Sequence, residues 1–206
     1  MIRFSAPDKA RISAAIDAAE RSTSGEFVAV VARASDHYAL LPLLWAAMVA
    51  LLFPGACLLA RLSLRWVHLY QLQLLIFIAL AVLLLSVPGL HLKLVPRRVQ
   101  HARASRLARA QFYEQGVQLT PHHSGVLLFV SLAERYVEIV ADKGIHEKLG
   151  EAHWRRIIDR FVDQVRAGRV VDGFVDAIGA CGAAMAEHYP PDPADTNVLS
   201  DGLIEL

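Results

Sequence analysis

Two long runs without charged residues dominate the pattern of hydrophobic and polar positions. The first extends from Ala39 to Ala60 and the second from Val67 to Leu90, and only the six residues RLSLRW separate them. About 20 apolar residues are enough for a helix to cross a hydrocarbon core ~30 Å thick. We therefore expect a hairpin of two transmembrane helices, at residues 39–60 and 67–90. A hairpin buried in a soluble core is the alternative, but two such runs rarely fit inside a chain of 206 residues.

The rest of the chain has the shorter periodicities of a soluble α/β domain. The segment Ser5-Ala-Pro-Asp8 is typical of a helix start, with a capping serine and an acidic third residue. Short continuous apolar runs rich in valine and leucine predict strands that are covered on both faces. The expected strands are 27–32, 126–132 and 136–141. The expected helices follow Ser5, span 99–117 and 154–165, and begin at a cap formed by Asp172, with a turn-like tail after the prolines at 190–193. In the helix at 99–117, one side is expected to carry the arginines and the other the apolar residues Val99, Ala102, Ala110, Tyr113 and Val117.

The order of these elements predicts one domain that the hairpin interrupts. The first strand must run towards the bilayer, since only six residues (33–38) separate it from the first apolar run. The helix at 99–117 must then return to the other end of the sheet, so that the second strand runs parallel to the first. We predict an α/β fold, a small mixed sheet flanked by helices, formed by residues 1–38 and 91–206 and interrupted by the hairpin at 39–90.

Charge indicates the orientation and excludes some partners. Lys93 and five arginines follow the hairpin, whereas the connection between its two helices contains only two arginines. The side of the membrane with the excess of positive charge is usually the cytoplasmic one. The first residues lack the apolar segment of a signal peptide. A net charge of +1 gives no reason to expect nucleic acid as a partner. We expect an integral protein of a bacterial inner membrane, with cytoplasmic termini, the bilayer and other membrane proteins as partners, and an oligomeric state left open.

The first candidate site lies at the edge of the sheet away from the hairpin. Glu26 precedes the first expected strand, Asp142 follows the third, and Ser124 lies just before the second. Two carboxylates there could hold Ca²⁺ or Mg²⁺, which prefer oxygen ligands. The simpler interpretation is a solvated charge at Glu26 and a turn initiated by Asp142.

The second candidate site lies at the opposite edge of the sheet. Asp36, Ser131, Glu134 and Arg135 lie at the carboxyl ends of the first two strands, where open α/β sheets usually bind their ligands. Asp36 and Glu134 are the candidate metal ligands of this edge. The alternative is that Ala133-Glu134-Arg135 forms only a polar hairpin turn.

Other motifs of catalysis are missing from the sequence. The chain has no G-x-S-x-G, P-loop or Cys–His motif, and His122-His123 and His146 with His153 lack the spacing of a helical metal pair. The sequence therefore assigns no cofactor beyond the Ca²⁺ or Mg²⁺ that the candidate sites could hold. Cys57 and Cys181 fall in different predicted parts, so no disulfide is implied.

Several phrases resemble one known family. ISAAIDAAERSTSGEFVAVVA, SGVLLFVSLAERYVEIVADKGI and AGRVVDGFVDAIGACGAAMAEHYP are similar to the TPM domain, found in thylakoid-lumen proteins of photosystem II maintenance and in many bacterial membrane proteins. The resemblance is greatest to a bacterial subgroup with a hairpin inserted in the domain. It implies a non-catalytic interaction or maintenance module for membrane proteins or, as the alternative, a divalent-metal-dependent acid phosphatase-like hydrolase. The scattered acidic residues favour the first.

The predicted orientation can be checked with reporter fusions. A reporter that is active only in the cytoplasm should be active when joined to Met1 and when joined to Leu206, because the positive charge that follows the hairpin resists translocation. A periplasmic signal from either fusion would contradict the orientation.

Overall fold

The computed structural model describes residues 4–206 except 63–64, 88, 121–122, 192–198 and 200–201. The chain forms two compact units, one of Met1–Ser35 with His101–Leu206 and the other of Asp36–Gln100. The predicted domain limits at residues 38 and 91 stay a prediction.

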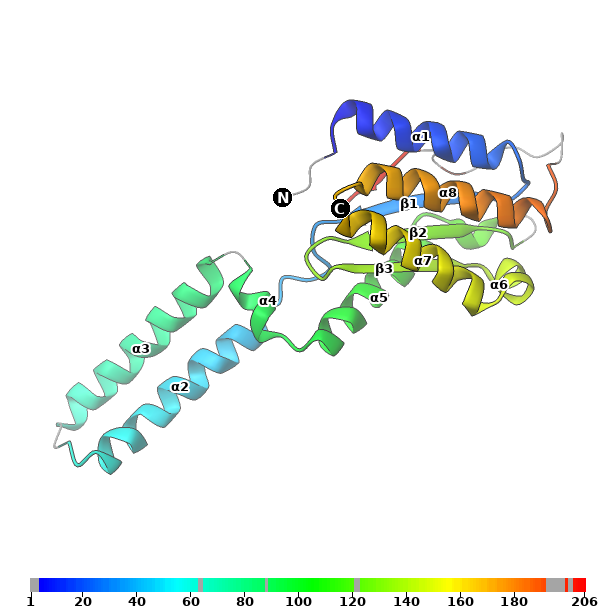
Figure 1. The fold of residues 1–206 in the computed structure, drawn as a ribbon. Coiled ribbons are helices and arrows are strands. Elements are labelled where there is room, and N and C mark those ends of the chain that lie inside the picture. The colour runs from blue at the N-terminus through cyan, green and yellow to red at the C-terminus, as the bar shows by residue number, and fades with distance from the viewer. Residues whose placement is uncertain (1–3, 63–64, 88, 121–122, 192–198, 200–201) are drawn as a thin grey trace. The chain divides into compact units, whose positions relative to one another are not determined.

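The first unit combines a sheet with helices, and the second consists of helices (Figure 1). The long helix α5 (Arg97–Glu114) begins in the second unit and continues in the first. The second unit also contains α2 (Leu40–Leu59), α3 (Trp66–Ser86) and α4 (Leu90–Leu94). The first unit contains α1 (Ala6–Glu20), β1 (Phe27–Ala32), the 3-10 helix η1 (Val117–Leu119), β2 (Val126–Ser131), β3 (Tyr136–Ala141), α6 (Lys143–Leu149), α7 (Glu151–Arg166), α8 (Val170–Ala186) and β4 (Ile204–Glu205).

The sheet is mixed, with the strand order β3-β2-β1-β4. β1 and β2 are parallel, in a register from Phe27↔Val126 to Ala32↔Ser131. β3 is antiparallel to β2. The predicted fold class, including the parallel pairing across the hairpin, is confirmed. The short β4, which pairs Ile204 with Val30, was missed, because its two residues carry no strand periodicity in a tail that reads as turns.

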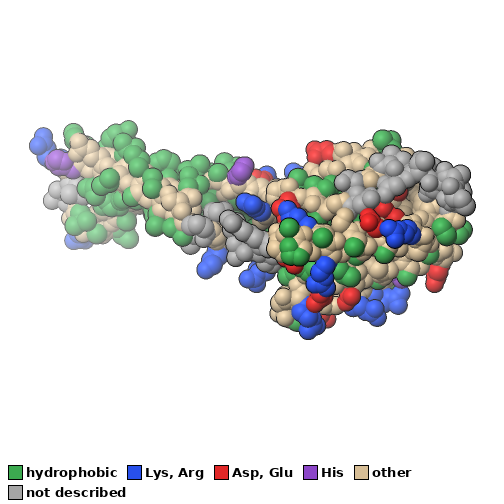
Figure 2. Space-filling view, turned by 90° about the horizontal axis from the view of Figure 1, so that it is seen from above, with side chains coloured by type: hydrophobic (Ala, Val, Ile, Leu, Met, Phe, Trp, Pro, Cys, Tyr) green, Lys and Arg blue, Asp and Glu red, His purple; other side chains and the backbone are tan. Residues whose placement is uncertain are grey.

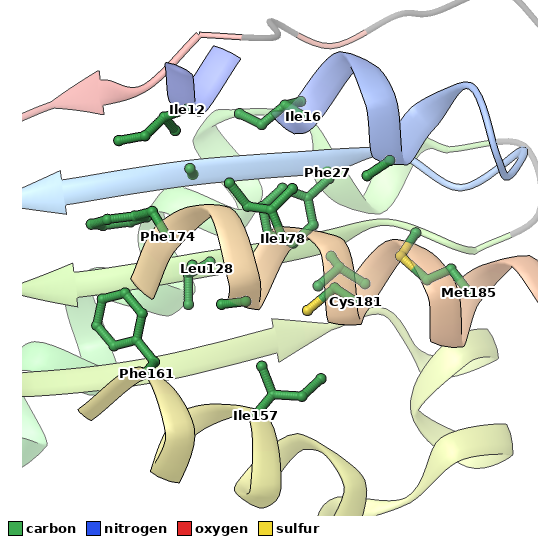
Figure 3. Packing of buried hydrophobic residues seen from close by; sticks show 14 of the residues in the cluster. Ile12, Ile16, Phe27, Leu128, Ile157, Phe161, Phe174, Ile178, Cys181 and Met185 are labelled. Atoms are coloured by element: carbon green, nitrogen blue, oxygen red, sulfur yellow. The ribbon is translucent and has the colours of Figure 1, made fainter. Parts of the chain in front are cut away.

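Alternate residues of β1 and β2 face two different helical layers. Phe27, Ala29 and Val31 of β1 contribute to the core beneath α1, α7 and α8, while Val28 and Val30 contribute to the core beneath α5. Figure 1 shows the three helices on one face of the sheet, and Figure 3 shows the larger core from close by. Full burial of a large apolar side chain contributes ~1.5–3 kcal/mol. The continuous apolar pattern of these strands is therefore the pattern of a three-layer α/β/α unit.

Helix starts and faces were predicted with mixed success. Ser5 caps α1, and its side chain and that of Asp8 form the expected capping box. The expected apolar side of α5 is wrong: Ala102 and Ala110 are exposed, and Ala104 and Ala108 are buried against the sheet. Alanine occurs on both sides of α5, so composition could not identify the buried side.

The predicted cap of the last helix is also wrong. α8 begins at Val170, before Asp172, and its N-cap residue Arg169 makes no side-chain capping bond. Asp172 lies in the first turn and accepts a hydrogen bond from Arg11 Nη2 at 2.8 Å. The Asp172 side chain thus links α8 to α1 at the surface.

The second unit has two helices that are long and apolar enough to cross a membrane, α2 and α3. Small side chains recur on the buried side of α2, at Ala46, Ala50 and Cys57, as is common where transmembrane helices pack closely. Leucine and other large apolar side chains are exposed on both helices, and Figure 2 shows this apolar surface in green. In water such a surface would be unfavourable, because each exposed apolar side chain loses the free energy of burial.

Two glycines of α8 offer a matched test of its packing on α1. A Cβ added at Gly182 would lie 2.7 Å from Ala19 Cβ and 3.0 Å from Ala19 Cα, whereas one added at Gly179 would meet nothing within 4 Å. Gly182→Ala should lower the free energy of unfolding by about 1–2 kcal/mol, because overpacking outweighs the gain in helix propensity. Gly179→Ala should raise it by up to ~1 kcal/mol.

Urea denaturation of the full chain in detergent micelles measures both variants. Equal effects of the two substitutions would contradict the close approach of α8 to α1.

Candidate binding cleft at the β2–β3 turn

A buried carboxylate organises the turn between β2 and β3. Glu134 is fully buried, and its Oε1 accepts a hydrogen bond from the backbone N of Ser35 at 2.8 Å. Its Oε2 accepts a hydrogen bond from the hydroxyl of Ser131, which in turn accepts one from Ser35 Oγ at 2.8 Å. The segment after β1 is thereby joined to the turn after β2. These three residues, Ser35, Ser131 and Glu134, are called the Ser–Glu cluster below.

A cleft of about 400 Å³ opens between this turn and α7. Its size lies in the ~300–1,000 Å³ range of ligand pockets. The walls are mainly apolar, and two arginines, Arg135 from the turn and Arg166 from the end of α7, also line it. The other lining residues are Val130, Ser131, Leu132, Tyr136, Val137, Phe161, Val162 and Val165.

Arg135 has an unusual backbone conformation at this cleft. Its φ is +52°, in the left-handed region that costs a non-glycine residue on the order of 1 kcal/mol or more. The conformation closes the turn that leads from Leu132 to Tyr136. Arg166 contacts Asp163 at 3.5 Å, but both side chains are about three-quarters exposed, so this surface pair contributes little. Both guanidinium groups can therefore meet an anionic group of a ligand.

Tyr136 is the remaining ionisable residue that lines the cleft. Its hydroxyl donates to Glu138 Oε2 at 3.0 Å, and Ser105 Oγ donates to Glu138 Oε1 at 3.3 Å. Burial, followed by the nearby charge of Glu138, raises the pKa of Tyr136 to about 12. Near neutral pH the phenol is thus protonated and is unsuited to act as a general base.

The sheet edge at Glu26 brings together backbone segments as predicted, but its carboxylates have structural partners. Glu26 is buried and its Oε2 accepts from the backbone N of Leu199 at 2.8 Å. Asp142 caps α6: its Oδ1 accepts from the backbone N of Lys143 at 2.6 Å, and its Oδ2 lies 3.1 Å from His123 Nδ1. Sequence reasoning placed a turn at Asp142 and missed the helix α6, which is only seven residues long.

Ser124, the third residue of this edge, is also in a structural position. Its side chain is fully buried, and its hydroxyl donates to the backbone O of Ser24 at 3.4 Å. Over the part of the chain that the structure describes, no group of three or more His, Cys, Asp or Glu side chains is placed to hold a metal. Ca²⁺ or Mg²⁺ bound by two carboxylates therefore stays a prediction.

Of the predicted residues at the opposite edge, Ser131 and Glu134 meet in one cluster. Arg135 follows them and lines the cleft. Asp36 belongs to the second unit, where its Oδ1 accepts from the backbone N of Tyr38 at 3.4 Å, and its pairing with Glu134 as a metal site stays a prediction. His122 lies outside the described residues.

Two residues of this region were not predicted. Ser35 was not identified because its partners are almost a hundred positions away in the sequence. Arg166 was not identified because nothing in the sequence of α7 shows that its end lies beside the β2–β3 turn. Only the tertiary structure shows that Ser35 and Arg166 lie beside this turn.

Comparisons with known proteins point to one family. Residues 93–184, which include α5, β2, β3, α6, α7 and most of α8, match the family model described as "TPM domain". No curated protein was found to match the chain.

A solved structure has a similar fold. The NMR structure of the BA42 protein from the psychrophilic bacterium Bizionia argentinensis is 18% identical to this chain, with a TM-score of 0.62. The match covers 99% of this chain and 96% of that one. At this identity the likeness shows the fold alone.

The protonated state of Tyr136 gives a prediction on pH. Because its folded pKa of about 12 exceeds the ordinary tyrosine pKa of 10.0, the neutral phenol stabilises the fold fully below pH 10, and this contribution is lost as the pH rises from 10 to 12. Absorbance at 295 nm should show one tyrosinate that forms near pH 12, and Tyr136→Phe should remove that component.

Tyr113→Phe is the control for this titration, since Tyr113 is exposed. It should leave the component near pH 12 in place. A titration curve that Tyr136→Phe does not change near pH 12 would show that the phenol is not held as described.

Proposed function

Since the chain carries a TPM domain, we propose that it is a membrane-tethered, non-catalytic module that binds other membrane proteins through the cleft at the β2–β3 turn. The bound segment combines apolar side chains with acidic ones. α2 and α3 anchor the module in the bilayer of a bacterial inner membrane, with both termini in the cytoplasm. The observation that carries the proposal is the composition of the cleft.

The cleft is suited to recognition more than to chemistry. Apolar walls bury a partner's side chains, and the guanidinium groups of Arg135 and Arg166 pair with carboxylates in bidentate geometry. A hydrolase also needs a group that can transfer protons near neutral pH. The ionisable side chains that line this cleft are two arginines and the phenol of Tyr136, which do not meet that need.

The predicted carboxylates also support a binding module. Both oxygens of Glu134, and one oxygen of Glu26, accept hydrogen bonds from the protein. Asp142 holds the first turn of α6 and contacts His123. Such hydrogen bonds are what buried carboxylates need in order to be stable in a fold. Each carboxylate therefore has a structural role that is independent of any reaction.

Photo-crosslinking in native membranes tests the proposal. A benzophenone amino acid at Val162, which lines the cleft, should form adducts with a membrane protein, and the crosslinked peptide should carry apolar and acidic residues. The double substitution Arg135→Glu and Arg166→Glu should lower the yield of adduct at least about tenfold, since loss of paired charge at an interface costs ~2–5 kcal/mol.

The same crosslinker at Asp159, an exposed position of the same helix outside the cleft, is the matched control and should not form this adduct. Adducts at Val162 that do not depend on the two arginines would contradict the proposed recognition.

An activity assay tests the alternative of a phosphatase-like hydrolase. The full chain in detergent should not release phosphate from a phosphomonoester when Ca²⁺ or Mg²⁺ is added. Metal-dependent turnover that Glu134→Gln abolishes, while the urea midpoint of unfolding is unchanged, would establish the hydrolase and refute the binding module.

A further inference from the structure

α5 carries an unusual concentration of positive charge. Between Asp36 and Glu114 the sequence contains no acidic residue. Six basic residues lie in the 17 positions from Lys93 to Arg109, five of them on α5 itself. Ten residues separate the end of α3 at Ser86 from the start of α5 at Arg97. The charge therefore follows an apolar helix of membrane-spanning length almost directly in the sequence.

Three arginines of α5 lie on an exposed side of the helix, away from the side that packs on the sheet. The side of α5 that packs on the sheet is formed by Ala104, Ala108 and Phe112, which are buried at the four-residue spacing of one helix face. Arg98, Arg106 and Arg109 are exposed. At 100° per residue, Arg98 and Arg109 differ by only about 20° around the helix axis, and Arg106 lies within about 80° of both. These three residues are called the arginine face below.

Among the described residues, no carboxylate is paired with the arginine face. Over the described part of the chain, no ion pair or hydrogen bond involves the side chains of Arg98, Arg106 or Arg109. By contrast, Arg11 pairs with Asp172 and Arg155 with Glu151. The eleven helical steps from Arg98 to Arg109 extend about 16 Å, so the face is long enough to contact several small anions.

We propose that the arginine face binds the phosphate groups of anionic phospholipids. Guanidinium groups bind phosphate through paired, charge-assisted hydrogen bonds. Clusters of four to eight Lys or Arg next to a membrane helix attract anionic lipids, with about 1 kcal/mol, or about fivefold in affinity, per residue at the surface. Lipid is favoured over an acidic protein because only a short connection of ten residues, which includes α4, leads to α5 from α3, whose large apolar side chains are exposed.

The inference rests on the proposed function in one respect, that α2 and α3 span the bilayer. It goes beyond that function because the arginine face and the cleft at the β2–β3 turn share no residues. Binding of lipid phosphate would hold α5, and with it the sheet that α5 covers, at the headgroup layer. That layer is where a segment of another membrane protein emerges from the bilayer.

Native mass spectrometry of the full chain tests lipid binding. The protein is purified in detergent, and phosphatidylglycerol or phosphatidylcholine is added as the probe lipid. The intact protein should retain phosphatidylglycerol at least about tenfold better than phosphatidylcholine, and the preference should weaken as the ammonium acetate concentration rises. The triple variant Arg98→Gln, Arg106→Gln and Arg109→Gln should lose at least about tenfold of its affinity for phosphatidylglycerol.

A second triple variant on α7 controls for net charge. Arg155→Gln, Arg156→Gln and Arg160→Gln removes the same three charges from exposed positions of the same unit and should keep the lipid preference. Circular dichroism shows whether both variants keep the helical content of the native chain, as expected for exposed sites. An unchanged affinity in the α5 variant, or equal losses in both variants, overturns the proposal. Equal retention of the two lipids by the native chain also overturns the proposal, and it is the result expected if the arginine face binds an acidic protein in place of lipid.

A separate measurement distinguishes this failure from failure of the proposed membrane anchor. The full chain is reconstituted in pure phosphatidylcholine vesicles and washed with alkaline carbonate. If the chain is extracted, the hairpin does not span the bilayer and both proposals fall. If it remains in the vesicles and phosphatidylglycerol is not preferred, only the role of the arginine face is refuted.

Discussion

The parallel pairing of β1 with β2 is the constraint on which the first unit depends. Parallel neighbours cannot be joined by a tight turn, so the chain must leave the end of β1 at Ala32 and return to the start of β2 at Val126. α5 makes that return, and its buried alanines let it lie close to the sheet. The insertion of residues 36–100 leaves this pairing intact because it falls between β1 and β2, where the crossover already needs a long connection. A hairpin suits this position because its two ends come close together.

The Ser–Glu cluster closes the end of the sheet where the chain leaves β1. A buried carboxylate is stable only when its oxygens are hydrogen-bonded, and here Ser35 and Ser131 supply the donors. These bonds fix Ser35, the last residue of its segment in the first unit, against the β2–β3 turn. They also hold the turn in the conformation that gives Arg135 its positive φ. The residue that sequence reasoning considered as a metal ligand therefore positions the neighbouring arginine.

The fold could be predicted from sequence where one local signal decided the outcome. The runs FVAVVA and YVEIVA matched β1 and β3 residue for residue, and the parallel direction of β2 followed from chain connectivity alone. Prediction failed where the two sides of a helix were equally apolar in the sequence, as for α5, which has alanines on both sides. It also failed at β4, where Leu206 N donates to Val31 O although nothing in the tail reads as a strand. The pairing of β4 depends on a strand edge that only the folded sheet offers.

The candidate site, like the fold, could be predicted from the sequence only in part. The sequence could place Ser131, Glu134 and Arg135 at the carboxyl ends of the parallel strands, since that edge follows from strand order. It could not show that Glu134 is buried, because burial depends on the register that brings Ser35 beside it. A carboxylate is acidic in either setting, but an exposed one can bind a cation, while a buried one that accepts two hydrogen bonds holds a turn. The side chains of the cleft that are left to meet a partner include the exposed Arg135 and Arg166 and the partly exposed Val162, whereas the buried side of α7 belongs to the core. Glu26 and Glu134 are buried and hydrogen-bonded within the fold, whereas Arg135, Arg166 and the arginine face are exposed, and this difference supports the proposal of anionic partners.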